Sequence, residues 1–266
     1  MQSAIYGLAG PSMTADERDF FSDSDPAGYI LFRRNCVDPT QLRALTDDLR
    51  GLSGRPDLPI LIDQEGGRVA RMRPPQWPEF PPGWAFAELY ETAPISAIEA
   101  ARSNARALAL MLREAGINID CLPLLDVRAP GAHDIIGDRA LGAEPMQVAA
   151  LGRAVLDGFA SAGVVGVVKH LPGHGRALCD SHVELPLVEA SETELARDLE
   201  PFERLNWAPM GMTAHVVYTA WDEERPASLS RQVICEIIRG RIGFTGWLMS
   251  DDIGMEALKG DFGERA

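Results

Sequence analysis

One short segment of this chain concentrates side chains that could do acid–base chemistry. Within 14 positions, from Lys169 to His182, the segment holds a lysine, three histidines and an aspartate. It follows Gly163–Val168, an apolar run bounded by glycine that is typical of a buried strand. Polar residues concentrated at the end of a strand are unsuited to a core, and they suit the rim of an active site.

Asp180 and His182 lie two positions apart in a stretch rich in glycine and small polar residues. A lone histidine in such a stretch would more simply be a solvated loop residue. Asp180, however, can accept a hydrogen bond from one ring nitrogen, which fixes the tautomer and raises the basicity of the other nitrogen. We therefore interpret the pair as an acid/base that protonates a leaving oxygen and then deprotonates water.

Two adjacent carboxylates, Asp251 and Asp252, follow the predicted strand Trp247–Met249. One of them can cap a following helix, a role that aspartate favours. Capping gives no reason for the second carboxylate. A carboxylate at the mouth of a barrel can attack the anomeric carbon of a sugar and form a covalent glycosyl intermediate. These considerations leave the choice between the two acids open.

Lys169, His170 and His174 could be metal ligands, but their spacing matches no known zinc pattern and lysine is a poor ligand. Hydrogen bonding to a polyhydroxylated substrate suits them better. We therefore expect no metal and no cofactor.

A second polar cluster, Asp63–Arg68 together with Arg71, offers acids and arginines that can bind pairs of hydroxyl groups. The alternative for Glu65 and Arg68 is a surface ion-pair cluster. In that case a turn is enough to explain the two glycines between them.

The remainder of the chain alternates short apolar segments with amphipathic ones. The apolar segments are predicted to be parallel strands covered on both faces: Ala4–Leu8, Gly28–Phe32, Leu58–Ile62, Ile117–Leu125, Gly163–Val168, Met210–Ala214 and Trp247–Met249. Seven strands in one series favour a (β/α) barrel over a doubly wound sheet, and no G-x-G-x-x-G follows the first strand. Active sites of barrels form at the carboxyl ends of the strands. The reactive side chains fall there: Asp63, Asp126, Lys169, His170, His215, Asp251 and Asp252.

Three helices and two capping boxes are predicted between the strands. Asp38 can cap a helix that begins with Pro39, and apolar residues at helical spacing mark further helices around 95–112 and 148–159. Capping boxes begin at Thr14 and Ser191.

Composition limits the classes of partner. The net charge of −14 disfavours binding to nucleic acid and to anionic lipid. No apolar run approaches the ~20 residues that span a bilayer, and the first ten residues lack the features of a signal peptide. The four cysteines form no C-x-x-C pair, so neither a zinc site nor a disulfide framework is indicated. We expect a soluble, cytoplasmic protein whose partner is a small carbohydrate, with no membrane partner and an oligomeric state that stays open.

Several motifs in this order resemble the β-N-acetylglucosaminidases of glycoside hydrolase family 3. The similarity runs from about Gly28 to the end of the chain. The motifs are Ile30–Asn35, Asp63–Val69, Ile136–Arg139, Lys169–His182, Ala214–Val216 and Ser250–Asp252.

The resemblance implies a TIM-like barrel and a retaining, metal-free mechanism. By motif position it makes Asp251 the nucleophile, His182 the acid/base on a mobile loop, and Asp180 the partner of His182. The implied sugar-binding residues are Asp63, Arg71, Arg139, Lys169 and His170. The implied substrate is a muropeptide with a non-reducing terminal β-1,4-linked N-acetylglucosamine on an anhydro-muramyl unit, the substrate of peptidoglycan recycling.

The chain departs from the family pattern at four places. Leu171, Leu178 and Thr213 stand where the family usually has phenylalanine, threonine and proline. Family members also continue after the nucleophile with a further βα unit, whereas Leu258–Ala266 contains no apolar strand. We therefore expect residues 1–266 to form a single barrel domain of the family's N-terminal type that lacks its last βα unit, as a C-terminal truncation would.

Two other functions remain as alternatives. A glycoside phosphorylase of the same family is one, because a histidine acid/base would not repel phosphate as a carboxylate does. A catalytically inactive sugar-binding barrel is the other, and a metal-dependent hydrolase has little support.

Overall fold

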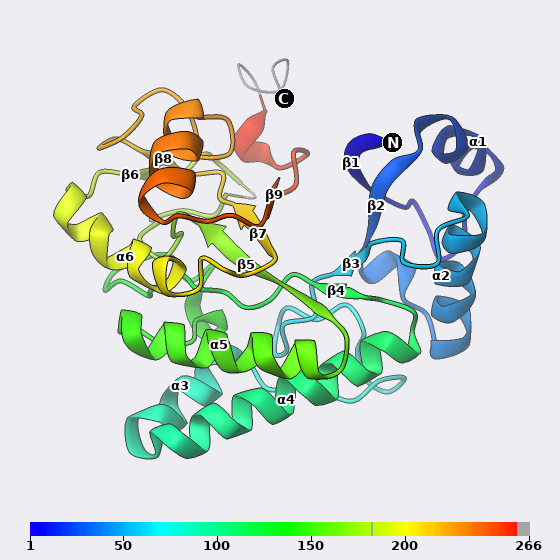
Figure 1. Ribbon diagram of the computed structural model, residues 1–266, viewed down its shortest axis with the longest axis horizontal. Helices are drawn as coiled ribbons and strands as arrows, with labels where there is room; N and C mark the ends of the chain where they lie inside the picture. The colour runs from blue at the N-terminus through cyan, green and yellow to red at the C-terminus, as the bar shows by residue number, and fades with distance from the viewer. Residues whose placement is uncertain (182, 260–266) are drawn as a thin grey trace.

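The computed structural model describes residues 1–181 and 183–259 (Figure 1). Seven strands form one sheet in which every neighbouring pair is parallel and the sheet order follows the chain order. The strands are β1 (Gln2–Gly7), β2 (Pro26–Leu31), β3 (Ile60–Ile62), β4 (Ile119–Asp120), β5 (Val165–Leu171), β7 (Met210–Thr213) and β9 (Trp247–Ser250). This curled, partial barrel with helices packed around it confirms the predicted α/β fold class.

All seven predicted strands are present with shifted bounds, and two of them differ most. The segment predicted as Ile117–Leu125 forms only the two-residue β4, because the Leu122 N–H donates to the Asp120 carbonyl within the segment and Pro123 has no N–H. Leu124 then makes one isolated parallel bridge to Lys169. Strand β5 extends three residues beyond its predicted end. Lys169 and His170 therefore lie within the last three residues of the strand and not after it.

Helices connect the strands and pack on the outside of the sheet (Figure 1). They are α1 (Ala15–Ser24), α2 (Pro39–Ser53), α3 (Gly83–Thr92), α4 (Pro94–Glu114), α5 (Pro145–Ser161) and α6 (Glu192–Arg204). A π-helix covers Val233–Arg241, and short 3-10 segments cover Arg33–Asn35, Gly137–Arg139 and Glu256–Leu258. A small second sheet, which the sequence did not predict, pairs β6 (Leu187–Val188) with β8 (Val217–Tyr218).

The predicted helix starts are confirmed. The side chain of Asp38 accepts a hydrogen bond from the Gln41 N–H at 2.9 Å, and Pro39 is the first residue of α2. Thr14 and Ser191 form complete capping boxes with Glu17 and Glu194. Each box satisfies backbone N–H groups that have no partner within the helix.

The core has three parts. The largest lies between the sheet and the helices, where α2 buries Leu42, Leu45 and Leu49. The second fills the concave side of the sheet with Leu61, Ile119, Cys121, Val167, Met210 and Met212. The third is small and joins Leu124, Ile136 and Ala140. The second cluster thus joins side chains from β3, β4, β5 and β7 and from Cys121, which follows β4.

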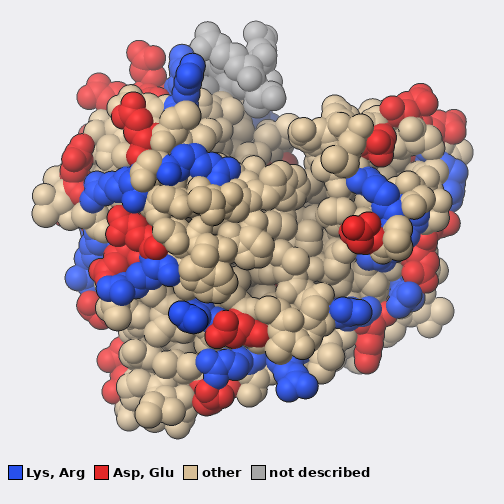
Figure 2. All heavy atoms as spheres, in the orientation of Figure 1, with Lys and Arg blue, Asp and Glu red and all other residues tan. Residues whose placement is uncertain are grey.

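The sheet remains open between its first and last strands. Among the described residues β1 and β9 pair only with β2 and β7, respectively. Figure 2 shows the surface hollowed between the side that carries β1 and the side that carries β9, with acidic and basic side chains interspersed around it. None of the helices that the structure describes has both the length and the apolar character needed to cross a bilayer.

Candidate active site

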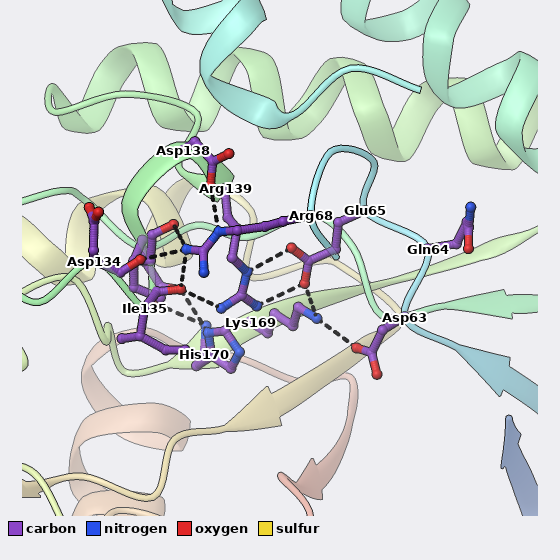
Figure 3. Close-up of polar contacts among 12 residues, drawn as sticks. Asp63, Gln64, Glu65, Arg68, Asp134, Ile135, Asp138, Arg139, Lys169 and His170 are labelled. Carbon is purple, nitrogen blue, oxygen red and sulfur yellow. Dashed lines mark hydrogen bonds and ion pairs between the residues drawn. The ribbon is translucent and has the colours of Figure 1, made fainter. Parts of the chain in front are cut away.

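The residues predicted to bind sugar meet at the carboxyl ends of β3 and β5. Lys169, near the end of β5, places its Nζ 2.9 Å from Asp63 Oδ1 and 2.8 Å from Glu65 Oε1 (Figure 3). Asp63 directly follows β3, 106 positions earlier in the chain. Because the strands are parallel, their ends lie at one edge of the sheet, and this edge brings the lysine between two carboxylates.

Two arginines extend this cluster at both ends. Arg139 donates to both oxygens of Glu65 at 2.8 Å, and Arg71 Nη2 donates to Asp63 Oδ2 at 3.1 Å. The result is a charge row of alternating sign: Arg71, Asp63, Lys169, Glu65, Arg139. The side chains of Asp63 and Arg71 are 15% and 26% exposed, whereas that of Lys169 is 2% exposed. A ligand would therefore meet the Asp63–Arg71 end of the row.

The groups of the charge row are held in their ionised forms. Burial by itself would raise the pKa of Asp63, but the charges of Lys169 and Arg71 outweigh it and lower that pKa. Burial likewise opposes the ionisation of Glu65, and the cations Arg139 and Lys169 bring its pKa well below the usual range. The same carboxylates raise the pKa of Lys169 despite its burial. Such fixed charges are strong hydrogen-bonding partners for hydroxyl groups.

His170 is oriented by Asp126, a fully buried residue. Asp126 Oδ2 lies 2.7 Å from His170 Nδ1, and Oδ1 accepts the backbone N–H groups of His170 and His174 at 3.2 and 2.7 Å. Burial opposes the ionisation of Asp126, but these contacts, led by His170, lower its pKa to about 2. A carboxylate at Nδ1 favours the tautomer with the proton on that nitrogen. Asp126 therefore fixes both the ring and the chain after β5.

Asp251 lies at the same edge of the sheet. It follows β9, and its N–H donates to the carbonyl of Thr213 at 3.2 Å, at the end of β7. Its Oδ1 accepts the N–H of Asp252 at 2.8 Å. Asp251 is half-buried, whereas Asp252 is exposed and its Oδ1 accepts the Gly254 N–H. Asp252 thus stabilises a turn. The helix cap predicted for one of the two acids is not formed, because the next helical segment, Glu256–Leu258, is preceded by Met255.

The loop that carries Asp180 reaches the segment that follows Asp251. The Ser181 carbonyl accepts the Ala257 N–H at 3.3 Å, and Ser181 Oγ lies 3.4 Å from His174 Nε2. Asp180 is half-buried. The predicted acid/base, His182, lies outside the described residues.

Sequence reasoning missed two residues that support the charge row. Gln64, which is 1% exposed, accepts the N–H groups of Arg71 and Met72 through Oε1 at 2.8 and 2.9 Å, so it positions the loop that carries Arg71. Asp120 Oδ1 accepts the N–H of Gln64 at 3.0 Å, and burial raises the pKa of Asp120 well above its ordinary value. A single acid within the apolar run Ile117–Leu125 is the signal that could have identified Asp120.

The glycines of the Asp63–Arg68 motif do more than form a turn. A Cβ atom on Gly66 would lie 2.2 Å from the carbonyl oxygen of Pro81, and Gly66 has φ of +97°. Only glycine allows this backbone conformation and this close approach.

Arg68 and Glu65 have different environments. Arg68 Nε donates to Asp138 at 2.7 Å, and Arg68 Nη2 donates to the carbonyl of Ile135 at 2.9 Å, with its side chain 44% exposed. Arg68 is therefore in a surface ion-pair cluster, as the alternative interpretation held. It lines a 430 Å³ cavity together with Trp84, Arg128, Asp134 and Asp138. Glu65, in contrast, belongs to the buried charge row.

Within residues 1–181 and 183–259, no group of three or more histidine, cysteine or acidic side chains is arranged to hold a metal ion. The cysteines described there are free thiols.

His174 makes the stability of the protein depend on pH. Burial, with a contribution from His170, lowers the pKa of His174 to about 4 from 6.5. The unfolded chain therefore binds a proton that the folded protein excludes, and stability falls as the pH falls from 6.5 to about 4. His174→Asn is expected to remove up to about 3 kcal/mol of the stability difference between pH 7 and pH 4.

Urea unfolding of the wild type and His174→Asn across this pH range measures the effect. His133→Asn is the control, because His133 is exposed. Parallel stability curves for the wild type and His174→Asn would contradict the expectation.

Comparison with known proteins shows the family of the chain. The family model for the glycosyl hydrolase family 3 N terminal domain matches residues 2–265. β-Hexosaminidases of Aromatoleum aromaticum and Methylococcus capsulatus are 39% and 40% identical over 267 residues, which is 98% of this chain and 74% and 78% of those proteins. The crystal structure of NagZ from Neisseria gonorrhoeae in complex with N-trifluoroacetyl-D-glucosamine matches with a TM-score of 0.88 and 36% identity, over 94% of this chain and 74% of that chain.

The matched region includes the strand ends that carry the charge row and Asp251. The predicted glycoside hydrolase class is confirmed at this level. The chain belongs to glycosyl hydrolase family 3, among its β-hexosaminidases.

Proposed function

We propose that this chain is a retaining exo-β-N-acetylhexosaminidase that removes terminal β-1,4-linked N-acetylglucosamine from muropeptides. The observation that carries the proposal is the common edge of the sheet, where a preorganised charge row lies two strands away from a half-buried carboxylate, Asp251. An enzyme that holds a sugar by its hydroxyl groups and attacks its anomeric carbon needs both parts in one place.

The charge row is the proposed sugar-binding part. Asp63 can accept hydrogen bonds from hydroxyl groups, while Arg71, Lys169 and Arg139 can donate, and His170 is held beside them by Asp126. Because every group already has a partner, the site needs little reorganisation when the substrate binds. When the charge row holds one terminal sugar ring, the leaving group lies on the open side of the sheet. This arrangement suits an exo-acting enzyme.

Asp251 is the proposed nucleophile. Its carboxylate forms a bond to the anomeric carbon while the bond from that carbon to the leaving oxygen breaks, and the leaving oxygen takes a proton from His182. In the second step, His182 removes a proton from water, the water oxygen bonds to the anomeric carbon, and the Asp251 carboxylate is released. Asp180 is the proposed partner that raises the basicity of His182.

The finer assignments rest on the family resemblance. The relative from Neisseria gonorrhoeae is in complex with N-trifluoroacetyl-D-glucosamine, which supports an acetamido sugar as the bound unit. The anhydro-muropeptide substrate, a role in peptidoglycan recycling, and a cytoplasmic location belong to the same proposal. We also propose that residues 1–266 act as one catalytic domain.

Hydrolysis of aryl glycosides tests the function. The chain is expected to release the chromophore from an aryl β-N-acetylglucosaminide much faster than from the matching β-glucoside, and to release N-acetylglucosamine from an anhydro-muropeptide. Free sugar as the product in phosphate buffer supports hydrolysis, whereas sugar 1-phosphate identifies a phosphorylase. Tight binding of N-acetylglucosamine without turnover identifies an inactive sugar-binding barrel and contradicts the proposal.

A further inference from the structure

His215 is a buried histidine next to the proposed nucleophile, and neither the charge row nor the acid/base pair includes it. It lies two residues beyond β7 and is 1% exposed. Both ring nitrogens have partners: Nδ1 lies 2.6 Å from Ser228 Oγ, and Nε2 lies 3.1 Å from the carbonyl oxygen of Asp252. The two contacts satisfy the polar atoms of the buried ring, and the second of them reaches the residue that follows the proposed nucleophile.

The partners determine the tautomer of His215. A carbonyl oxygen only accepts, so Nε2 must carry the proton that it donates to Asp252. Burial lowers the pKa of His215, and the opposing effect of Asp251 is smaller, so the ring is neutral. Nδ1 therefore accepts a hydrogen bond from the Ser228 hydroxyl. Ser228 is itself fixed, because its N–H donates to the Ala214 carbonyl at 3.2 Å. His215 therefore connects a fixed hydroxyl to the chain that follows the nucleophile.

The position of Asp252 controls the carboxylate of Asp251. Pairing between β7 and β9 reaches Ser250, and the Asp251 N–H makes one further contact, to Thr213. Beyond that point the Asp251 carboxylate accepts the N–H of Asp252, whose carbonyl is held by His215. If the main chain at Asp252 shifted, the N–H that orients the carboxylate would shift with it.

We propose that His215 is a positioning residue that orients the Asp251 carboxylate by holding the main chain of Asp252. The proposal rests on the proposed role of Asp251 as nucleophile. It goes further because it states that His215, which follows β7, holds the Asp251 carboxylate in line with the anomeric carbon.

Two substitutions separate the contacts of His215. The amide nitrogen of glutamine lies close to where Nε2 lies, and that of asparagine lies close to where Nδ1 lies. His215→Gln thus retains donation to Asp252, and His215→Asn loses it. His215→Asn is expected to lower kcat on the aryl β-N-acetylglucosaminide by about 10²-fold, because a small misplacement of a reacting group has an effect of this order. His215→Gln is expected to retain most of kcat.

The KM and the affinity for N-acetylglucosamine measured by calorimetry are expected to be unchanged in both variants, since His215 contacts no member of the charge row. Retained affinity also shows that each variant is folded. The inference is overturned if His215→Asn has the kcat of the wild type, or if kcat and sugar affinity fall together by the same factor.

A double variant separates this inference from the proposed function. In the Asp251→Ala background, His215→Asn is expected to cause no further loss, because the two residues act as one unit. An active Asp251→Ala variant would overturn both the proposed nucleophile and the role of His215. An inactive Asp251→Ala variant beside a fully active His215→Asn variant would overturn the role of His215 alone.

Discussion

Asp251→Ala is expected to lower kcat on the aryl β-N-acetylglucosaminide by on the order of 10⁴-fold or more, the range seen when a nucleophile is removed. The carboxylate is the group proposed to bond to the anomeric carbon, and no neighbouring acid replaces it: Asp252 is exposed and its Oδ1 is engaged by the Gly254 N–H. Steady-state release of the chromophore measures the loss, and binding of N-acetylglucosamine by the variant shows that the site is intact.

Asp252→Ala is the matched control for this prediction. It removes the adjacent carboxylate of the same charge and leaves the main-chain carbonyl that His215 contacts. Its kcat is expected to stay within a few-fold of the wild type, the effect of losing one exposed turn contact. The reverse result, with Asp252→Ala inactive and Asp251→Ala active, would exchange the roles of the two acids.

Azide provides a stereochemical check of the same prediction. In Asp251→Ala, azide can occupy the space of the missing carboxylate and attack the anomeric carbon from the nucleophile's face. The expected product is the α-glycosyl azide, because a single displacement inverts the β configuration. Formation of the β-glycosyl azide would contradict the assignment, since it places the vacated carboxylate on the leaving-group side.

Among the substitutions proposed for this protein, Lys169→Met is expected to lower the free energy of unfolding most. Lys169 is the only residue that contacts both carboxylates of the charge row in the described structure, and its removal leaves Asp63 and Glu65 buried with one arginine each. Removing one partner of a buried ion pair typically costs about 3–5 kcal/mol. Urea unfolding measures this loss, and calorimetry is expected to show that N-acetylglucosamine no longer binds.

An exposed ion pair is the control for Lys169→Met. Arg18 and Asp48 lie 3.0 Å apart with both side chains about half exposed, so Arg18→Ala is expected to change stability by only about 0–1 kcal/mol. In the Lys169→Met background, Asp63→Asn should restore part of the stability, because it removes the charge of a mostly buried carboxylate that has lost its contact with Lys169. Equal stability of Lys169→Met and Arg18→Ala would show that the charge row does not stabilise the fold.

Local patterns in the sequence predicted the elements well. A helix cap such as Asp38 or Thr14 acts within a few residues, and an apolar strand is recognised from its own side chains, so both were found. The bounds of β4 and β5 were wrong because they depend on pairing between strands, which Pro123 interrupts in one and the neighbouring β7 prolongs in the other. The two-residue strands β6 and β8 are too short to give a pattern.

The sequence also determined which residues lie at the carboxyl-terminal edge of the sheet. In a parallel sheet all carboxyl ends lie together, so placing Asp63, Lys169, His170 and Asp251 at strand ends was enough to predict one site. Motif order added the roles proposed for Asp251, Asp180 and His182.

Only the tertiary structure decided how these side chains are paired. In the structure, Lys169 lies between Asp63 and Glu65. Arg139 pairs with Glu65, whereas Arg68 lies in a surface ion-pair cluster. His215 contacts the main-chain carbonyl of Asp252. The physical reason is that the strength of a charge pair or hydrogen bond depends on distances of a few ångströms and on burial. The chain acquires both only when segments 37 to 106 residues apart in the sequence pack together.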